Sequence, residues 1–220
     1  FIPGSYNNEI NYAIIKNGTT GIHADTVSNS NPTVIIRNTI ITNMSSIGIL
    51  GQGARLEVSN SVISQCGQYT VACYIGGDYT FNHCTFANYW NYSFRNTPSI
   101  LLNNYYYDNN DNIQIRNLNN AYFGNCLIYG SLSTEISFDN NENGQFNFTF
   151  DHSLIKIDPN TNTISNNYIN IIKNSDPLFT DYLNNDFSLK ENSPAINSGN
   201  FQISQNNNLL YDLKEVNRND

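Results

Sequence analysis

The stretch Val34-Ile35-Ile36-Arg37-Asn38-Thr39-Ile40-Ile41-Thr42-Asn43 carries a pattern that recurs along most of this chain. Two alternating apolar residues precede an Asn, a small residue, two more apolar residues and a second Asn. Residues 8–17, 56–65, 79–88, 100–109, 121–130 and 148–157 follow the same line. Repeats with periods of roughly 20–50 residues are typical of solenoids. The small slot holds Ala13, Thr39, Ser61, Cys84, Tyr105, Cys126 and Ser153, at steps of 26, 22, 23, 21, 21 and 27 residues.

Each copy predicts short strands joined by corners. Alternation of apolar residues at period two is typical of a half-buried strand. The slot that ends it reads Asn38, Asn60, His83, Asn104, Asn125 and His152, and Asn tolerates the left-handed backbone that a corner needs. A second strand follows, and a third apolar pair comes later at Ile47/Ile49, Val71/Cys73, Ile113/Ile115 and Ile136/Phe138.

Three strands and three corners per turn predict an all-β fold, a single-stranded right-handed parallel β-helix of about seven to eight coils. A leucine-rich horseshoe is the alternative at this period, but it needs recurrent Leu and a helical segment in each repeat. The repeats are expected over residues 1–159, and an irregular C-terminal tail packed on the same domain over 160–220.

The repeat also predicts which side chains face the core. Alternation along each strand places one column inward and the next outward. The slot after the small residue is apolar and is expected to face outward, covered in part by residues 176–200 of the tail. The inward columns are Ile36, Val58, Phe81, Leu102, Phe123 and Phe150, and Ile41, Ile63, Phe86, Tyr107, Ile128 and Ile155; the outward one is Ile14, Ile40, Val62, Thr85, Tyr106, Leu127 and Leu154.

The tail carries a resemblance. Asp176-Pro177-Leu178-Phe179, Asp186-Phe187-Ser188-Leu189 and Ser193-Pro194-Ala195-Ile196-Asn197-Ser198-Gly199 resemble the closing segment of secreted right-handed parallel β-helix repeat proteins of pectate-lyase-like fold from carbohydrate-degrading Gram-negative bacteria. Residues 8–18 resemble their first coil. The resemblance implies an exported protein of the periplasm or outer-membrane surface, often a lipoprotein, and assigns no activity. Because that family usually closes with a further strand, and no cap precedes the first coil, we expect a truncated chain with an upstream domain.

Composition excludes several classes of partner. The net charge of −8 argues against nucleic acid, which requires a basic surface. No apolar run approaches the roughly 20 residues of a transmembrane helix.

Of the four cysteines, Cys84 and Cys126 are predicted to lie two coils apart, about 10 Å, too far for a disulfide. Cys66 and Cys73 flank a corner, and we interpret both as thiols with a disulfide between them as the alternative.

Catalytic chemistry finds little support in the sequence. A lyase needs a base and cations beside the substrate carboxylate, and Lys16 and Arg37 are predicted on different faces. An inverting glycosidase needs carboxylates about 6.5–9.5 Å apart. Asp108 and Asp111 are the dense acidic pair, and they fall in an Asn-rich loop. No spacing predicts a metal site, so no cofactor is expected; Ca²⁺ would be required only by the enzyme alternative.

Aromatic residues give the better indication of a binding site. The segment Tyr89-Trp90-Asn91-Tyr92 is predicted to be a loop, and loops that project from a rigid solenoid are where such proteins bind. The sequence thus predicts an exported carbohydrate-binding or scaffold module with a poly- or oligosaccharide partner. The alternatives are a polysaccharide lyase or glycoside hydrolase, and a structural spacer of a surface lipoprotein. The candidate ligand-binding residues are Trp90, Tyr89, Tyr92, Arg95, Tyr106 and Asp108.

Overall fold

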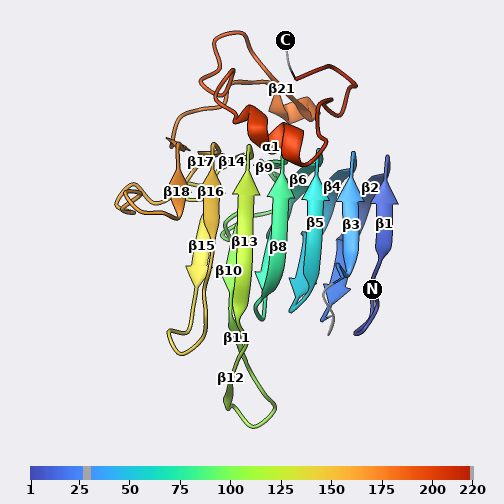
Figure 1. Ribbon diagram of the computed structural model, residues 1–220, viewed down its shortest axis with the longest axis vertical. Coiled ribbons are helices and arrows are strands. Elements are labelled where there is room, and N and C mark those ends of the chain that lie inside the picture. The colour runs from blue at the N-terminus through green and yellow to red at the C-terminus, as the bar shows by residue number, and fades with distance from the viewer. Residues whose placement is uncertain (27–30, 219–220) are drawn as a thin grey trace.

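Parallel strands stacked side by side make up most of the protein. The computed structural model describes residues 1–26 and 31–218, and its strands form curled sheets around one core (Figure 1). All neighbours in the first large sheet are parallel. Its order is β1 (Asn8–Asn11), β3 (Val34–Arg37), β5 (Arg55–Ser59), β8 (Gly77–Asn82), β13 (Leu118–Gly124), β16 (Thr149–Asp151) and β18 (Tyr168–Ile169).

The second large sheet comprises two parallel ladders that share one long strand. The first half of β4 (Ile40–Gln52) pairs with β6 (Val62–Cys66), and its second half pairs with β7 (Val71–Tyr74). The chain therefore visits three ladders in turn and returns to the first one step further along. The remaining members are β2 (Ile14–Asp25), β9 (Thr85–Asn88), β14 (Leu127–Gly130), β17 (Leu154–Ile155), β19 (Ile172–Lys173), β10 (Ile100–Asn103) and β15 (Ile136–Asp139).

The predicted Asn/His slot forms the corner between the first sheet and the second. Its residues adopt left-handed backbone, which Asn tolerates better than most residues. Asn104 is the exception: it does not have left-handed backbone, so its assignment to the slot is wrong. The side chains bond from coil to coil: the Asn60 Nδ2 donates to the Asn38 Oδ1 at 2.6 Å, and the Asn38 Nδ2 donates to the Asn11 Oδ1 at 3.0 Å. We call this column the corner ladder; its members are Tyr12, Asn38, Asn60, His83, Asn125, His152 and Asn170.

All three ladders contribute inward side chains to one core. The predicted second-sheet column is buried at Ile41, Ile63, Phe86, Ile128 and Ile155. The first sheet supplies another column of inward side chains. Phe81, Phe123 and Phe150 are fully buried, with ring centroids 4.8 Å and 4.9 Å apart. Leu102, expected in this column, instead lies in the third ladder opposite Cys73 and Phe138, so that assignment is wrong. Tyr107 is also wrong as an inward residue, because it is 58% exposed. The observed column is Ile10, Ile36, Val58, Phe81, Phe123, Phe150 and Tyr168.

Both errors have one cause, which is that residues 100–109 are not a coil of their own. Strand β10 belongs to the third ladder, and it is followed by an antiparallel hairpin of β11 (Tyr105–Tyr107) and β12 (Ile113–Ile115). One coil therefore runs the 42 residues from Cys84 to Cys126. These two cysteines lie in neighbouring coils rather than two coils apart. All four cysteines are free and buried, including Cys66 and Cys73.

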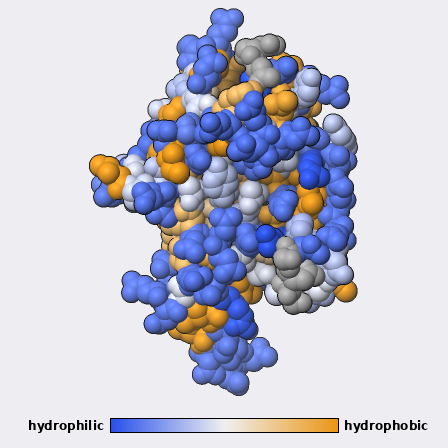
Figure 2. All heavy atoms as spheres, viewed as in Figure 1, coloured by the Kyte–Doolittle hydropathy of each residue, from blue (hydrophilic) through white to orange (hydrophobic). Residues whose placement is uncertain are grey.

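Residues beyond 159 extend the ladders before the chain leaves them. Strands β18 and β19 add one more pair of rungs, which end at Lys173. The tail that follows lies across the carboxyl ends of the first-sheet strands (Figure 1). Figure 2 shows mostly hydrophilic side chains on this tail, and a hydrophobic patch surrounded by hydrophilic side chains on the arm that projects at the opposite end. The tail contains β20 (Phe179–Asp181), η1 (Tyr182–Asn184), β21 (Asp186–Leu189) and α1 (Phe201–Asn206).

Candidate functional site

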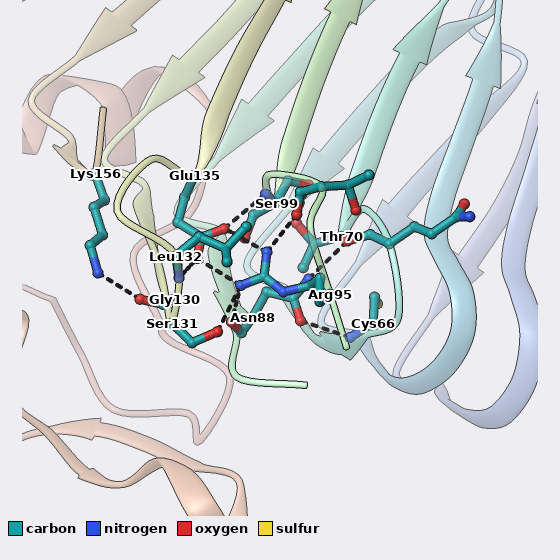
Figure 3. Close-up of polar contacts among 12 residues, drawn as sticks. Cys66, Thr70, Asn88, Arg95, Ser99, Gly130, Ser131, Leu132, Glu135 and Lys156 are labelled. Carbon is teal, nitrogen blue, oxygen red and sulfur yellow. Dashed lines mark hydrogen bonds and ion pairs between the residues drawn. The ribbon is translucent and has the colours of Figure 1, made fainter. Parts of the chain in front are cut away.

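A buried ion pair holds the loop that carries most of the predicted site. The Arg95 Nη2 lies 2.8 Å from the Glu135 Oε1, and the two side chains are 1% and 0% exposed (Figure 3). The guanidinium also donates to the Asn88 and Thr97 carbonyl oxygens. Glu135 accepts further bonds from the backbone N–H and the hydroxyl of Ser99. The pair thus joins loop 89–99 to the end of the third ladder.

The carboxylate of this Arg95–Glu135 cluster is saturated with protein partners, whereas the buried Arg95 Nε has no partner. Glu135 accepts two bonds from Arg95, two from Ser99 and one from the Leu132 N–H, which uses the hydrogen-bonding capacity of a carboxylate. Both side chains are buried, so a ligand in solvent does not reach this charge pair. The structure therefore places Arg95, a sequence-predicted ligand residue, inside the protein and away from solvent.

The same loop presents two aromatic rings over the second corner of the stack, the half-buried Trp90 and the exposed Tyr92. The Trp90 and Tyr92 ring centroids lie 4.9 Å apart, and Tyr92 is 74% exposed. A bond from the Trp90 indole N–H to the Ser93 Oγ, at 2.9 Å, holds the loop in its turn. We call the hollow beneath them the aromatic groove; it has a volume of about 470 Å³ and is lined by Asn17, Gly18, Thr19, Asn43, Ser45, Trp90 and Tyr92.

The floor of the aromatic groove is a second column of amides. Asn17 and Asn43 both have left-handed backbone, and the Asn43 Nδ2 donates to the Asn17 Oδ1 at 2.6 Å. Gly67 brings the next coil close: a Cβ there would lie 2.2 Å from the Ser45 carbonyl oxygen and 3.4 Å from the Trp90 ring. None of the described residues that line the groove is charged. Rings and amides together suit an uncharged, hydroxyl-bearing ligand.

The other predicted ligand residues lie elsewhere. Tyr89 stacks on Tyr182 of the tail at 4.1 Å between centroids, so its ring serves packing. Tyr106 lies on the hairpin, where Arg116 sits 5.5 Å from its ring centroid. Asp108 caps the hairpin tip by accepting from the backbone N–H groups of Asn110 and Asn112, which lowers the pKa of its carboxyl. The structure brings Trp90 and Tyr92 together and leaves the other four apart.

Two histidines of the corner ladder make polar contacts that could suggest catalysis. The His83 Nε2 lies 2.9 Å from the Ser204 Oγ of the tail and 3.1 Å from the Asn125 Nδ2. Burial, with a smaller effect of the Arg218 charge, lowers the pKa of His83 to about 3. A general base works best when its pKa is near the operating pH. His83 therefore acts as a neutral acceptor that holds the tail, and the same ladder slot holds His152 beside Asp151 at 2.6 Å.

Metal and thiol chemistry also find no site here. Among the described residues, no group of three or more His, Cys, Asp or Glu is placed to hold a metal ion. Burial raises the pKa of the Cys66 thiol to about 12, and it raises those of Cys73 and Cys126 as well. A thiol with a raised pKa is a poor nucleophile. In the part of the chain that is described, no helix is long and apolar enough to cross a membrane.

Sequence reasoning missed three groups that build these sites. Glu135 gave one signal, an acidic residue directly before an alternating apolar strand in a chain with few charges. Asn17 and Asn43 sit at the end of their repeat copies, but nothing in the pattern brings the Trp90 loop over them. Arg218, which donates to the Asn60 Oδ1 at 2.6 Å, is 158 residues away from its partner.

Comparison with known proteins identifies no relative. No family model matches the chain, and neither a curated protein nor a solved structure matches it.

Proposed function

We propose that the chain is a right-handed parallel β-helix that binds a neutral oligosaccharide in the aromatic groove. Three successive parallel ladders, revisited in the same order along the chain, support the fold. The resemblance of the tail to that of secreted repeat proteins supports an exported protein. The observation that carries the function is the pair of groove-lining rings, half-buried Trp90 and exposed Tyr92, above the Asn17 and Asn43 amides.

Sugar rings present a C–H face and a hydroxyl edge. The C–H face packs on an aromatic ring, and the hydroxyls exchange hydrogen bonds with amides, which both donate and accept. The groove volume of about 470 Å³ falls within the 300–1,000 Å³ common for ligand sites. The groove is widely open to solvent, as binding within a longer chain of sugars requires.

The lining favours binding over turnover. Elimination needs a base and a cation, and glycoside hydrolysis needs paired carboxylates. The described residues around the aromatic groove supply neither. The absence of cationic lining residues also favours uncharged sugars over uronic acids, because a carboxylate would gain no ion pair there.

A glycan-binding screen tests the proposal. The full chain is compared with the variant Trp90→Ala/Tyr92→Ala, which should bind a neutral oligosaccharide about tenfold more weakly or worse. Both rings are on the surface, so the melting temperature should stay within about 2 °C. Tyr107→Ala, an exposed aromatic on the hairpin, is the matched control and should bind normally. A chain that binds no glycan, or a double variant that binds as well as the parent, would contradict the proposal.

A further inference from the structure

The tail stands over the outward column of the second sheet and leaves a cleft beneath it. Ile14 of this column is 66% exposed, which confirms that its side chain faces outward. Tyr106, expected in the same column, lies on the β11–β12 hairpin, and Thr85 pairs directly with Leu127, so that assignment is wrong. Further along, Ile40, Val62 and Leu127 line one side of a hollow of about 540 Å³. Phe187, Leu189 and Leu213 of the tail line the other side. We call this hollow the tail cleft.

The cleft exists because the tail is attached along its polar side. Its bonds go to the corner ladder: the Asn125 Oδ1 accepts from the Asn200 N–H at 2.8 Å, and Ser204 contacts His83. Arg218 donates to the Asn60 Oδ1 at 2.6 Å. These contacts hold the tail along one edge of the outward column, and the six apolar side chains face a common space instead of packing together.

The charges around the tail cleft cancel and are committed to the protein. Asp186 and Asp212 face Lys214 and Arg218, which gives two acids and two bases. The Asp212 Oδ1 accepts from the Lys214 and Val216 N–H groups, both at 2.8 Å. The Lys214 Nζ donates to the Ser188 Oγ at 2.9 Å. A charged ligand would have to displace these bonds, whereas an uncharged one would not.

We propose that the tail cleft binds a neutral, predominantly apolar small molecule. Its body would replace water against the aliphatic floor and Phe187, where burial of apolar surface is favourable by roughly 25 cal/mol per Å². The hydroxyls of Thr42 and Thr85 on the floor suit a ligand with one hydroxyl or carbonyl group, while the buried Ser64 hydroxyl donates to the Thr42 Oγ1 at 2.9 Å. The cleft shares no lining residue with the aromatic groove, so this site is independent of sugar binding.

A fluorescence titration with N-phenyl-1-naphthylamine, a neutral aromatic probe, tests the site on the full chain. We expect saturable binding of about one probe per chain. Val62→Trp fills the cleft from its floor and should weaken binding about tenfold or more. Ile14→Trp places the same ring in the same column outside the cleft and should leave binding unchanged. If Val62→Trp fails to fold, Thr85→Phe fills the cleft from the next coil.

Three results would overturn the proposal. The first is a wild-type chain that shows no saturable binding, and the second is a filled variant that folds and binds as the parent does. The third concerns charge, and uses 1-anilinonaphthalene-8-sulfonate, which has similar rings and an anionic group. That probe should bind about tenfold more weakly than the neutral one; equal or tighter binding would mean that the cleft does not select against charge.

Discussion

Two insertions interrupt the same coil, and they are held in opposite ways. Loop 89–99 follows β9 and folds back on the stack, where Arg95 enters the interior and pairs with Glu135. Segment 104–117 follows β10 and projects from the stack as the β11–β12 hairpin, whose strands pair with each other alone. Within the first insertion a buried charge determines the shape, and within the second the backbone does.

The two insertions differ in how firmly each is attached to the stack, and therefore in how well each can hold a binding residue in place. The buried Arg95–Glu135 pair anchors loop 89–99. The anchor holds Trp90 and Tyr92 at a fixed position over Asn17 and Asn43. The hairpin has its own hydrogen bonds, and an isolated two-stranded hairpin is at best marginally stable in water. Its attachment rests on polar contacts at its base, such as the Tyr105 hydroxyl on the Asp139 Oδ1 at 2.8 Å. We therefore expect unequal consequences when each is altered.

The largest effect is expected for Arg95→Met. The substitution leaves the Glu135 carboxylate buried without its partner. We expect the free energy of unfolding to fall by about 3–5 kcal/mol, as is typical when one partner of a buried ion pair is removed. Urea unfolding measures the change in the free energy of unfolding. Arg116→Met on the hairpin removes an exposed guanidinium from the Tyr106 ring and should cost less than about 1 kcal/mol. Equal costs for the two substitutions would break the comparison.

A smaller effect is expected for Tyr105→Phe at the base of the hairpin. Loss of the bond to Asp139 should cost about 0.5–1.5 kcal/mol. That bond, with a smaller effect of burial, raises the pKa of Tyr105 to about 12. Below pH 10 the hydroxyl is protonated in both folded and unfolded chains, so its full contribution is present. Between about pH 10 and pH 12 only the unfolded chain releases the proton, and stability falls.

The titration of the Tyr105 ring, followed by NMR, checks this second prediction. Its midpoint should lie near 12, above the ordinary tyrosine value of about 10. If the parent and Tyr105→Phe lose stability equally between pH 10 and pH 12, the bond does not anchor the hairpin.

The smallest effect is expected when the hairpin tip is shortened. Residues 107–113 can be replaced by Asn-Gly, because Tyr106 and Gln114 are directly paired and Asn-Gly favours a two-residue turn. The replaced residues pair with neither of the two large sheets, and the pair Tyr107–Ile113 lies within the hairpin itself, so the free energy of unfolding should change by less than about 0.5 kcal/mol. Thermal melting followed by circular dichroism measures it. A large loss would indicate that the arm supports the stack after all.

The same two insertions mark where prediction from the sequence succeeds and where it stops. Period-two alternation found the ladders, and the Asn/His slot found the left-handed corner at Asn38, Asn60 and His83. Ile100 and Leu102 alternate in the same way, and Asn104 imitates a corner. A third-ladder strand and a first-sheet strand look alike locally, since their difference lies in which coil they pair with.

The candidate site shows the same limit. Trp90 and Tyr92 could be selected because they are neighbours in sequence and a loop was expected. The role of Arg95 could not be predicted, because Glu135 lies 40 residues away and across an insertion. Likewise, the sequence predicted that residues 176–200 cover the outward column, and residues 212–214 and Arg218 also line the cleft there. Contacts of long sequence separation are the ones that a repeat pattern does not contain.

The graded core column bears on how each coil finds its neighbour. The corner ladder repeats the same left-handed backbone at every step, mostly with Asn or His, so its backbone would fit a chain that skipped a coil. The core column does not repeat: Ile10, Ile36 and Val58 are aliphatic, whereas Phe81, Phe123 and Phe150 are rings stacked on one another. A skipped coil would set a ring against a branched chain and leave a gap. The size of the core side chains thus favours the correct pairing of neighbouring coils, whereas the corners determine only the spacing between coils.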